Sequence, residues 1–248
     1  MDGEADIAAI AAVLADRRRC SVLMALGDGR ALAASVLAAE AGVAPSTASE
    51  HLARLVAAGL ISVERRGRHR YFRLAGPHVA DLLEAMAVVA PPAPIRSLAD
   101  ETRARAIRAA RTCYDHLAGR LGVATMDSLL ERGWLEGSVD GAPRPAARPG
   151  TPPRIGGLAL TEPGAVFLEE LGIDLDHLPP RRPAIRFCID WSEQRPHLAG
   201  AVGAALTARL FDLGWIRRAD RSRAVRVTEE GRRGFAEAFG VRVAEHLG

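Results

Sequence analysis

The stretch that most constrains the fold is 45–74, PSTASEHLARLVAAGLISVERRGRHRYFRL, where helical spacing of apolar residues changes to strand alternation. Pro45 suits the first turn of a helix, and the apolar residues that follow it lie on one helical face. Residues 61–65 and 69–74 alternate as two strands that meet at a turn around Gly67. This pattern predicts a helix followed by a β-hairpin.

Two more helices are predicted before this stretch. Apolar residues recur at helical spacing from residue 5 until Gly-Asp-Gly at 27–29. The segment ALAASVLAAEAGV at 31–43 is predicted to be a short helix that ends at Gly42. Cys20 falls on the apolar face of the first helix and is predicted to be a small core residue. Three helices followed by a basic hairpin give the order of a winged helix-turn-helix.

The third predicted helix and the hairpin carry the residues that we expect to contact DNA. A helix that enters the major groove needs small, hydrogen-bonding side chains near its N-terminus, and a basic hairpin beside it reaches phosphates or the minor groove. A run of arginines is often only a solvated face, but here it directly follows a helix that begins with polar residues. The predicted DNA-binding residues are Ser46, Thr47, Ser49, His51 and Arg54 in the helix, and Arg65, Arg66, Arg68 and Arg70 in the hairpin.

Composition narrows the class of protein. A hydrophobic content of 48% with 25% charged residues argues against global disorder. No apolar run approaches the roughly 20 residues that cross a bilayer, so no membrane partner is expected. The chain begins with acidic residues and has no pattern of a signal peptide, and its 3 cysteines are too few for a disulfide framework. We therefore expect a cytoplasmic location.

Residues 5–90 resemble the DNA-binding domain of the ArsR/SmtB family of bacterial transcriptional regulators. The segments that carry the resemblance are DRRRCSVLMAL, LAAEAGVAPSTASEHLARLVAAGLI and VERRGRHRYFRL. The resemblance implies an obligate homodimer built from the first helix and the helix after the hairpin, about 77–90. It also implies a repressor that leaves its double-stranded DNA operator when an effector arrives. The chain is similar to a longer subgroup that carries a C-terminal extension.

The chain departs from the metal-sensing members of that family. Those members carry a Cys-x-Cys motif before the recognition helix, where this chain has ALAASVLAAEAG with no ligand. Others carry paired Asp and His ligands on the dimer helix, where His78 and Asp81 are present without a second histidine. Neither metal site of the family is carried over, and His78 is expected to be a surface residue.

A Pro-rich linker at 90–96 precedes a region that contains an internal sequence repeat. RTCYDHLAG at 111–119 matches RFCIDWSEQRPHLAG at 186–200, and both copies continue to a Gly-Trp pair and a Thr-Glu-x-Gly segment. Such a duplication predicts two degenerate winged-helix-like repeats in a pseudo-twofold relation. The predicted fold is mostly α with small β-hairpins, an α+β mix. The predicted domains are 1–90 for DNA binding and dimerisation, 97–173 for the first repeat with a Pro/Arg-rich loop at 138–154, and 184–248 for the second repeat.

The repeated Cys-x-Asp and His residues are the candidates for an effector site. Cys113 and His116 are predicted to share one face of a helix, and His197 is predicted to open a helix after Pro196. The pseudo-twofold relation would then bring the two sets together. The candidate effector-binding residues are Cys113, Tyr114, Asp115, His116, Cys188, Asp190, Trp191 and His197.

Four interpretations of this set remain open. Cys113, His116, Cys188 and His197 could bind Zn²⁺ or another transition metal, or the two thiols could form a redox pair. A small organic effector could lie between Tyr114, Trp134, Trp191 and Trp215. The fourth interpretation is that the shared residues only stabilise the fold.

The sequence predicts a DNA-binding regulator rather than an enzyme. It shows no oxyanion loop, no phosphate-binding glycine pattern and no cofactor fingerprint. The predicted function is a homodimeric repressor that an effector releases from its operator through the C-terminal region. The alternative is a winged-helix protein whose C-terminal region is a metal- or thiol-dependent enzyme, or serves only to brace the dimer.

Overall fold

The computed structural model describes residues 4–91, 93–95, 97–138, 157–219 and 222–243. The chain divides into two compact units, residues 1–83 and 84–248. The boundary lies before the predicted one at residue 90, and both predicted C-terminal repeats belong to the second unit. The predicted Pro/Arg-rich loop lies, apart from Ser138, outside the described residues.

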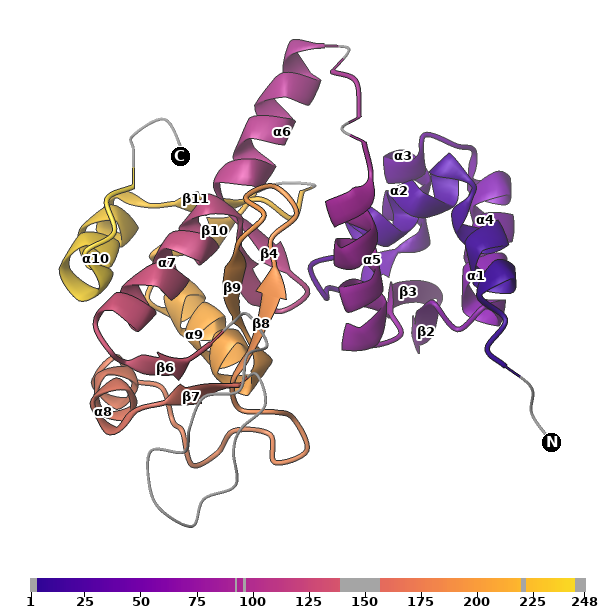
Figure 1. Cartoon of the computed structure of the whole chain (residues 1–248). Helices are drawn as coiled ribbons and strands as arrows, with labels where there is room; N and C mark the ends of the chain where they lie inside the picture. Colours follow the sequence, from indigo (N-terminus) through magenta and orange to yellow (C-terminus); the bar gives the residue numbers. More distant parts are fainter. Residues whose placement is uncertain (1–3, 92, 96, 139–156, 220–221, 244–248) are drawn as a thin grey trace. The chain divides into compact units, whose positions relative to one another are not determined.

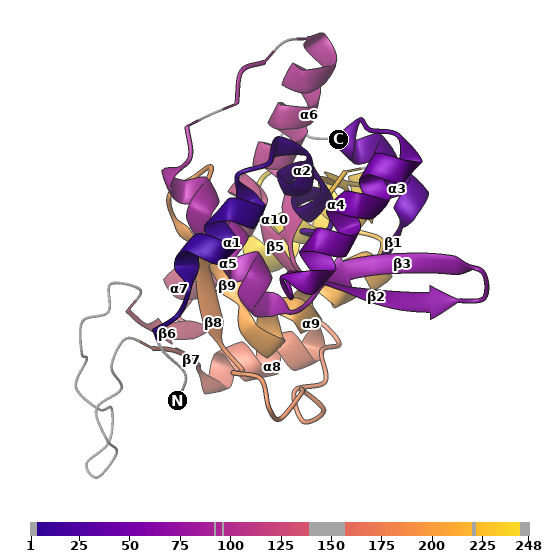
Figure 2. The ribbon, with the colours of Figure 1, turned by 90° about the vertical axis from the view of Figure 1, so that its right-hand side faces the viewer.

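The first unit has the predicted order of helices followed by a hairpin. Its elements are α1 (Ile7–Leu14), α2 (Arg17–Ala25), β1 (Leu32–Ala33), α3 (Ala34–Ala41), α4 (Pro45–Ala57), β2 (Ile61–Arg66) and β3 (His69–Leu74), with α5 (Pro77–Val89) running across the boundary between the units. The antiparallel sheet has the order β1-β3-β2. Figure 2 shows the hairpin of β2 and β3, the wing, extending beyond α3 and α4. The mixed α and β content of the whole chain confirms the predicted fold class.

The first predicted helix is in fact two helices. The carboxylate of Asp16 accepts the backbone N–H groups of Arg18 and Arg19 at 2.8 and 3.0 Å, so it caps a new helix there. Gly42, with a left-handed φ of 62°, ends α3 as predicted. Cys20 is half-buried rather than a full core residue, and its thiol contacts the carbonyl oxygen of Leu14 at 2.9 Å.

The second unit repeats one order of elements twice after its first complete helix. The elements are α6 (Leu98–Ala109), β4 (Arg111–Cys113), β5 (His116–Ala118), α7 (Gly119–Glu131), β6 (Leu135–Gly137), β7 (Leu158–Leu160), α8 (Glu162–Glu170), β8 (Arg186–Ile189), β9 (Pro196–Ala199), α9 (Gly200–Asp212), β10 (Ile216–Arg218), β11 (Val225–Val227) and α10 (Glu229–Phe239). A hairpin, a helix, a strand pair and a second helix therefore occur in each copy (Figure 1). None of the helices in the described part of the chain has the length and apolarity to cross a bilayer.

The repeated Gly-Trp and Thr-Glu-x-Gly segments contact each other in each copy. In the first, the Thr161 hydroxyl donates to the Gly133 carbonyl at 2.8 Å, and its oxygen accepts the Gly164 N–H at 3.1 Å to cap α8. A Cβ atom on Gly164 would lie 2.1 Å from the Trp134 carbonyl oxygen. The threonine and glycine therefore hold the start of the closing helix against the turn that precedes the strand pair.

The second copy reproduces these contacts closely. Thr228 donates to the Gly214 carbonyl at 2.8 Å and accepts the Gly231 N–H at 2.9 Å. A Cβ atom on Gly231 would lie 2.0 Å from the Trp215 carbonyl oxygen. The two copies also share one hydrophobic core, to which both contribute buried side chains, including Leu121, Met126, Leu129, Leu198, Val202, Leu210 and Phe235. The repeats therefore fold as one body.

Candidate metal centre and nucleic-acid interface

Cys113 and His116 lie on a hairpin, which corrects the prediction that they share a helix. They are directly opposite each other in the antiparallel pairing of β4 with β5. The turn between them is formed by Tyr114 and Asp115, and Tyr114 has a φ of 57°, in the region that favours glycine. A spacing of three residues suits both one face of a helix and the ends of a two-residue turn, so the spacing alone did not distinguish the two structures.

The second copy uses the same register with a longer loop. Cys188 lies opposite His197 in the pairing of β8 with β9, and α9 begins at Gly200. The prediction that His197 opens a helix is therefore wrong, because the residues from Pro196 are needed as the return strand. The carboxylate of Asp190 accepts the N–H of Ser192 at 2.9 Å and turns the chain at the start of the loop.

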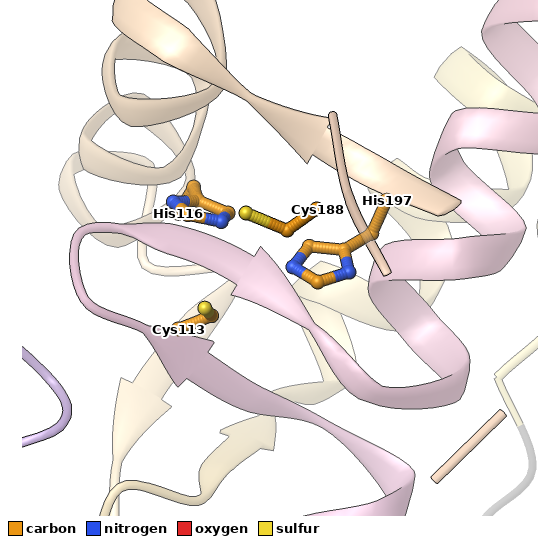
Figure 3. Close-up of side chains that lie close together, drawn as sticks. All are labelled: Cys113, His116, Cys188 and His197. Atoms are coloured by element: carbon orange, nitrogen blue, oxygen red, sulfur yellow. The ribbon is translucent and has the colours of Figure 1, made fainter. Parts of the chain in front are cut away.

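The two hairpins bring four side chains to one place. The Sγ atoms of Cys113 and Cys188 and a ring nitrogen of both His116 and His197 all lie within 4.8 Å of one another. Figure 3 shows the four side chains converging from the two hairpins. The imidazole rings stack with their centroids 5.1 Å apart, and both histidines and Cys113 are at most 4% exposed. Cys188 is half-buried. We call these four residues the Cys₂His₂ cluster.

Glycines shared by the two copies lie beside the histidines of the cluster. A Cβ atom on Gly122 of α7 would lie 3.7 Å from Cβ of His197, and one on Gly203 of α9 would lie 3.5 Å from Cβ of His116. The helix of each copy therefore packs against the histidine of the other copy. Such reciprocal contacts are those of a twofold arrangement.

Each histidine of the cluster has a carboxylate beside its Nδ1 atom. His116 Nδ1 lies 3.3 Å from Asp115 Oδ1, and His197 Nδ1 lies 3.8 Å from Asp190 Oδ2. Burial acts to raise the pKa of Asp115, but hydrogen bonds from Arg182 and His116 outweigh burial and lower it to about 2. The pKa of Asp190 is lowered as well, because the nearby arginine and the hydrogen bonds to its carboxylate outweigh the effect of burial. Both acids therefore stay ionised.

The imidazole nitrogens of the cluster are largely unsatisfied. His116 Nε2 and both ring nitrogens of His197 are buried and have no hydrogen-bond partner among the described residues. Burial lowers the pKa of His197 to about 3, so its ring is neutral at physiological pH. A hydrogen bond with Cys188, together with burial, raises the pKa of the Cys113 thiol well above its ordinary value.

A buried network of ions beside the cluster was missed by the sequence analysis. Arg111 is fully buried and lies 3.0 Å from Asp190 and 3.4 Å from Glu84. Arg223 lies 2.6 Å from Glu84. The positive charges of the two arginines therefore equal the negative charges of the two carboxylates. The sequence does place an arginine two residues before each repeated cysteine, Arg111 in the first copy and Arg186 in the second. Because Arg186 is exposed, this repeated arginine alone does not predict a buried ion pair.

The aromatic residues proposed for an organic effector separate in the structure. Trp134 stacks on Phe167 at 3.7 Å, and Trp215 packs at 5.7 Å from the Phe235 ring. Both therefore fill the space between the strand pairs and the closing helices. Trp191 lies beside the ion network, with its ring 4.8 Å from the Arg111 guanidinium.

The predicted recognition helix, α4, presents its polar residues to solvent. Leu52 and Leu55, on the opposite face of the same helix, are buried. Ser49 is exposed, and its hydroxyl donates to the Pro45 carbonyl at 3.0 Å. His51 is half-buried. The remaining predicted contacts on this helix, all exposed, are Ser46, Thr47 and Arg54.

The wing is exposed along its whole arginine run. Arg66 is held by Glu64 at 3.1 Å, whereas Arg68 and Arg70 form no ion pair with any described residue. Arg65 lies directly opposite Arg70 in the strand pairing. Like charges opposite each other destabilise a hairpin, so this pair favours an anion between or beside the two side chains.

Comparisons with known proteins match this organisation. A helix-turn-helix domain family matches residues 14–64. The uncharacterized HTH-type transcriptional regulator YdfF of Bacillus subtilis is 40% identical over 96% of this chain and 99% of its own length. The HTH-type transcriptional regulator Rv0324 of Mycobacterium tuberculosis is 36% identical over 34% of this chain and 37% of its own. Among solved structures, the homodimeric winged helix-turn-helix domain of Mb0332 from Mycobacterium bovis is 33% identical and covers 36% of this chain and 89% of its own, with a TM-score of 0.32.

Proposed function

Because the chain belongs to the family of helix-turn-helix transcriptional regulators, we propose that it is a homodimeric repressor whose operator affinity is set by an effector bound in its second unit. The observation that carries the DNA-binding half is the exposed polar start of α4, followed directly by a wing with Arg65 opposite Arg70. A helix of this kind reads base edges, while the wing arginines neutralise phosphates.

The dimer is supported by apolar side chains on the two helices that the ArsR/SmtB resemblance assigns to it. Ile7 on α1 is 77% exposed. On α5, Leu82, Met86 and Val89 are exposed at helical spacing and form one apolar stripe. Large exposed apolar side chains in a stripe are typical of protein interfaces. Sedimentation of the whole chain as a dimer supports this assignment, and a monomer at operator-binding concentrations contradicts it.

The first experiment follows binding of the full chain to DNA from its own upstream region by fluorescence anisotropy. We expect tight binding that falls steeply with salt, because each phosphate contact releases counterions. In vitro transcription from the same promoter then tests the repressor role, since a repressor lowers transcript yield in proportion to operator occupancy. Binding no tighter than to random DNA would refute the proposal.

Replacing Arg68 and Arg70 together with alanine is expected to weaken binding to specific and random DNA alike. Each arginine lost removes about one unit from the magnitude of the slope of log K against log salt, so the double variant loses about two. Arg66→Ala is the matched control, because its guanidinium is already held by Glu64 and is expected to contribute less. An unchanged salt slope in the double variant contradicts contact between the wing and phosphates.

Ser49→Ala and His51→Ala are expected to act differently, with a loss confined to the specific operator. A lost base contact costs about 1–3 kcal/mol of discrimination, and affinity for random DNA is retained. Competition anisotropy with operator and random duplexes measures the ratio. Equal losses on both duplexes would show that α4 contacts only the DNA backbone.

A further inference from the structure

We propose that the Cys₂His₂ cluster binds one transition-metal ion of the Zn²⁺ class, and that this ion is the effector of the second unit. The effector role rests on the proposed function, whereas the binding site stands on the geometry of the second unit alone. The set contains two thiols and two imidazoles, and a tetrahedral site of two sulfur and two nitrogen ligands is typical of zinc.

The separations in the cluster are close to those of an occupied site. With Zn–S of about 2.3 Å and Zn–N of about 2.0–2.1 Å, tetrahedral ligand atoms lie about 3.3–3.8 Å apart. The four ligand atoms of the cluster lie within 4.8 Å of one another without an ion. Binding therefore needs the widest pair to close by about 1–1.5 Å, a movement within the range of side-chain rotation.

The carboxylates beside the cluster suit metal-binding histidines. A ligating histidine usually donates its other N–H group to a carboxylate, which orients the ring and fixes its tautomer. Asp115 lies within hydrogen-bond distance of Nδ1 of His116, at 3.3 Å, whereas Asp190 lies 3.8 Å from Nδ1 of His197, too far for a hydrogen bond. Nε2 of each ring remains for an ion. Both Nε2 atoms are buried and have no hydrogen-bond partner in the described part of the chain.

Charge around the site also balances when an ion is bound. Binding releases the two thiol protons to solvent, the two thiolates offset the charge of a divalent cation, and imidazole ligands add no charge. The carboxylates do not add net charge, because Asp115 pairs with Arg182 and Asp190 pairs with Arg111. A buried site with no net charge avoids the large penalty of an uncompensated ion.

The two competing interpretations leave observations unexplained. A disulfide between Cys113 and Cys188 would use the sulfur atoms but leave three buried imidazole nitrogens without partners. Histidines that only stabilise a core normally form hydrogen bonds, because an unsatisfied buried polar atom is costly. A metal ion uses both cysteines and one nitrogen of each histidine, so that of the three nitrogens only Nδ1 of His197 stays without a partner, and it joins the two hairpins.

The site is tested with reduced, metal-free, full-length protein. Co²⁺ titration is expected to produce the visible spectrum of tetrahedral cobalt with thiolate ligands, saturating at one ion per chain. Zn²⁺ is then expected to displace the cobalt. No Co²⁺ or Zn²⁺ binding, or an octahedral cobalt spectrum, would overturn the site. Formation of a Cys113–Cys188 disulfide in a protein that binds no metal would replace it with a thiol switch.

Variants identify the ligands. Cys188→Ser and His197→Gln are each expected to weaken Zn²⁺ binding by more than about 100-fold, because losing a neighbour of a ligand already costs about 10–100-fold. Cys20→Ser and His177→Gln are matched controls outside the cluster, the latter at a side chain that is 85% exposed. Circular dichroism confirms the fold of each variant. Unchanged affinity in both folded ligand variants overturns the assignment.

Regulation is measured separately from binding. Zn²⁺ is expected to change operator affinity at least about 5-fold, the lower end of ordinary coupling between sites, and Cys188→Ser is expected to abolish that change. An ion that binds stoichiometrically without altering operator affinity overturns the effector role. Operator binding by the metal-free protein tests the DNA-binding function independently, so failure of the metal site and failure of the regulator are distinguishable.

Discussion

Arg111→Met is expected to lower the free energy of unfolding by about 3–5 kcal/mol, the usual cost of removing one partner from a buried ion pair. Methionine fills much of the volume of the arginine stem, so packing changes little. The loss arises because Asp190 and Glu84, both buried, lose a shared cation at 3.0 and 3.4 Å. Urea denaturation of the purified variant, followed by tryptophan fluorescence, measures the change.

The matched control for this variant is Arg105→Met. Arg105 pairs with Glu101 at 3.2 Å, but both side chains are about half exposed or more. Pairs of this kind contribute about 0–1 kcal/mol. If both variants lost the same free energy of unfolding, the buried Arg111 network would contribute no more than an exposed ion pair. That outcome would contradict the expected result.

Gly231→Ala is expected to destabilise the protein by about 1–3 kcal/mol or more, the cost of forcing an atom into a packed site. Alanine is ordinarily the better residue in a helix by up to about 1 kcal/mol, so helix propensity predicts the opposite sign. The added Cβ atom would lie 2.0 Å from the Trp215 carbonyl oxygen, which forces α10 away from the strand pair. Thermal denaturation of the variant measures the loss.

Two further substitutions test the cause. Gly164→Ala, the equivalent in the first copy, places Cβ 2.1 Å from the Trp134 carbonyl and is expected to have a similar cost. Gly157→Ala is the control, because a Cβ atom there meets nothing within 4 Å. A Gly231 variant as stable as the parent protein would show that the closing helix is not held by this contact.

The parts of the fold that depend on local sequence were predictable. The end of α3 at Gly42, the start of α4 at Pro45 and the wing follow from residues that lie within one turn or hairpin of each other. The duplication also indicated that Cys113 and Cys188 occupy equivalent positions. The predicted secondary structure was wrong in both copies: in the first, a three-residue spacing satisfies both a helix and a tight hairpin, and in the second His197 lies on a strand rather than at the start of a helix.

The parts that depend on contacts across the second unit were not predictable. Asp190 pairs with an arginine 79 positions earlier in the chain, and the sequence offered many arginines of similar appearance. Arg111 and Arg186 occupy equivalent positions in the two copies, yet only the first is buried. Pairing of this kind is decided by how the two hairpins pack against each other, and single-copy patterns carry no information about it.

The reciprocal packing of Gly122 on His197 and Gly203 on His116 has a consequence for how the cluster assembles. Each repeat supplies one cysteine and one histidine, the half-site that a single subunit of a twofold dimer would supply. Because both halves belong to one chain, their encounter is intramolecular and has a constant effective concentration. A half-site shared between separate chains would come apart on dilution. Here the completeness of the cluster does not depend on how many copies of the protein a cell contains.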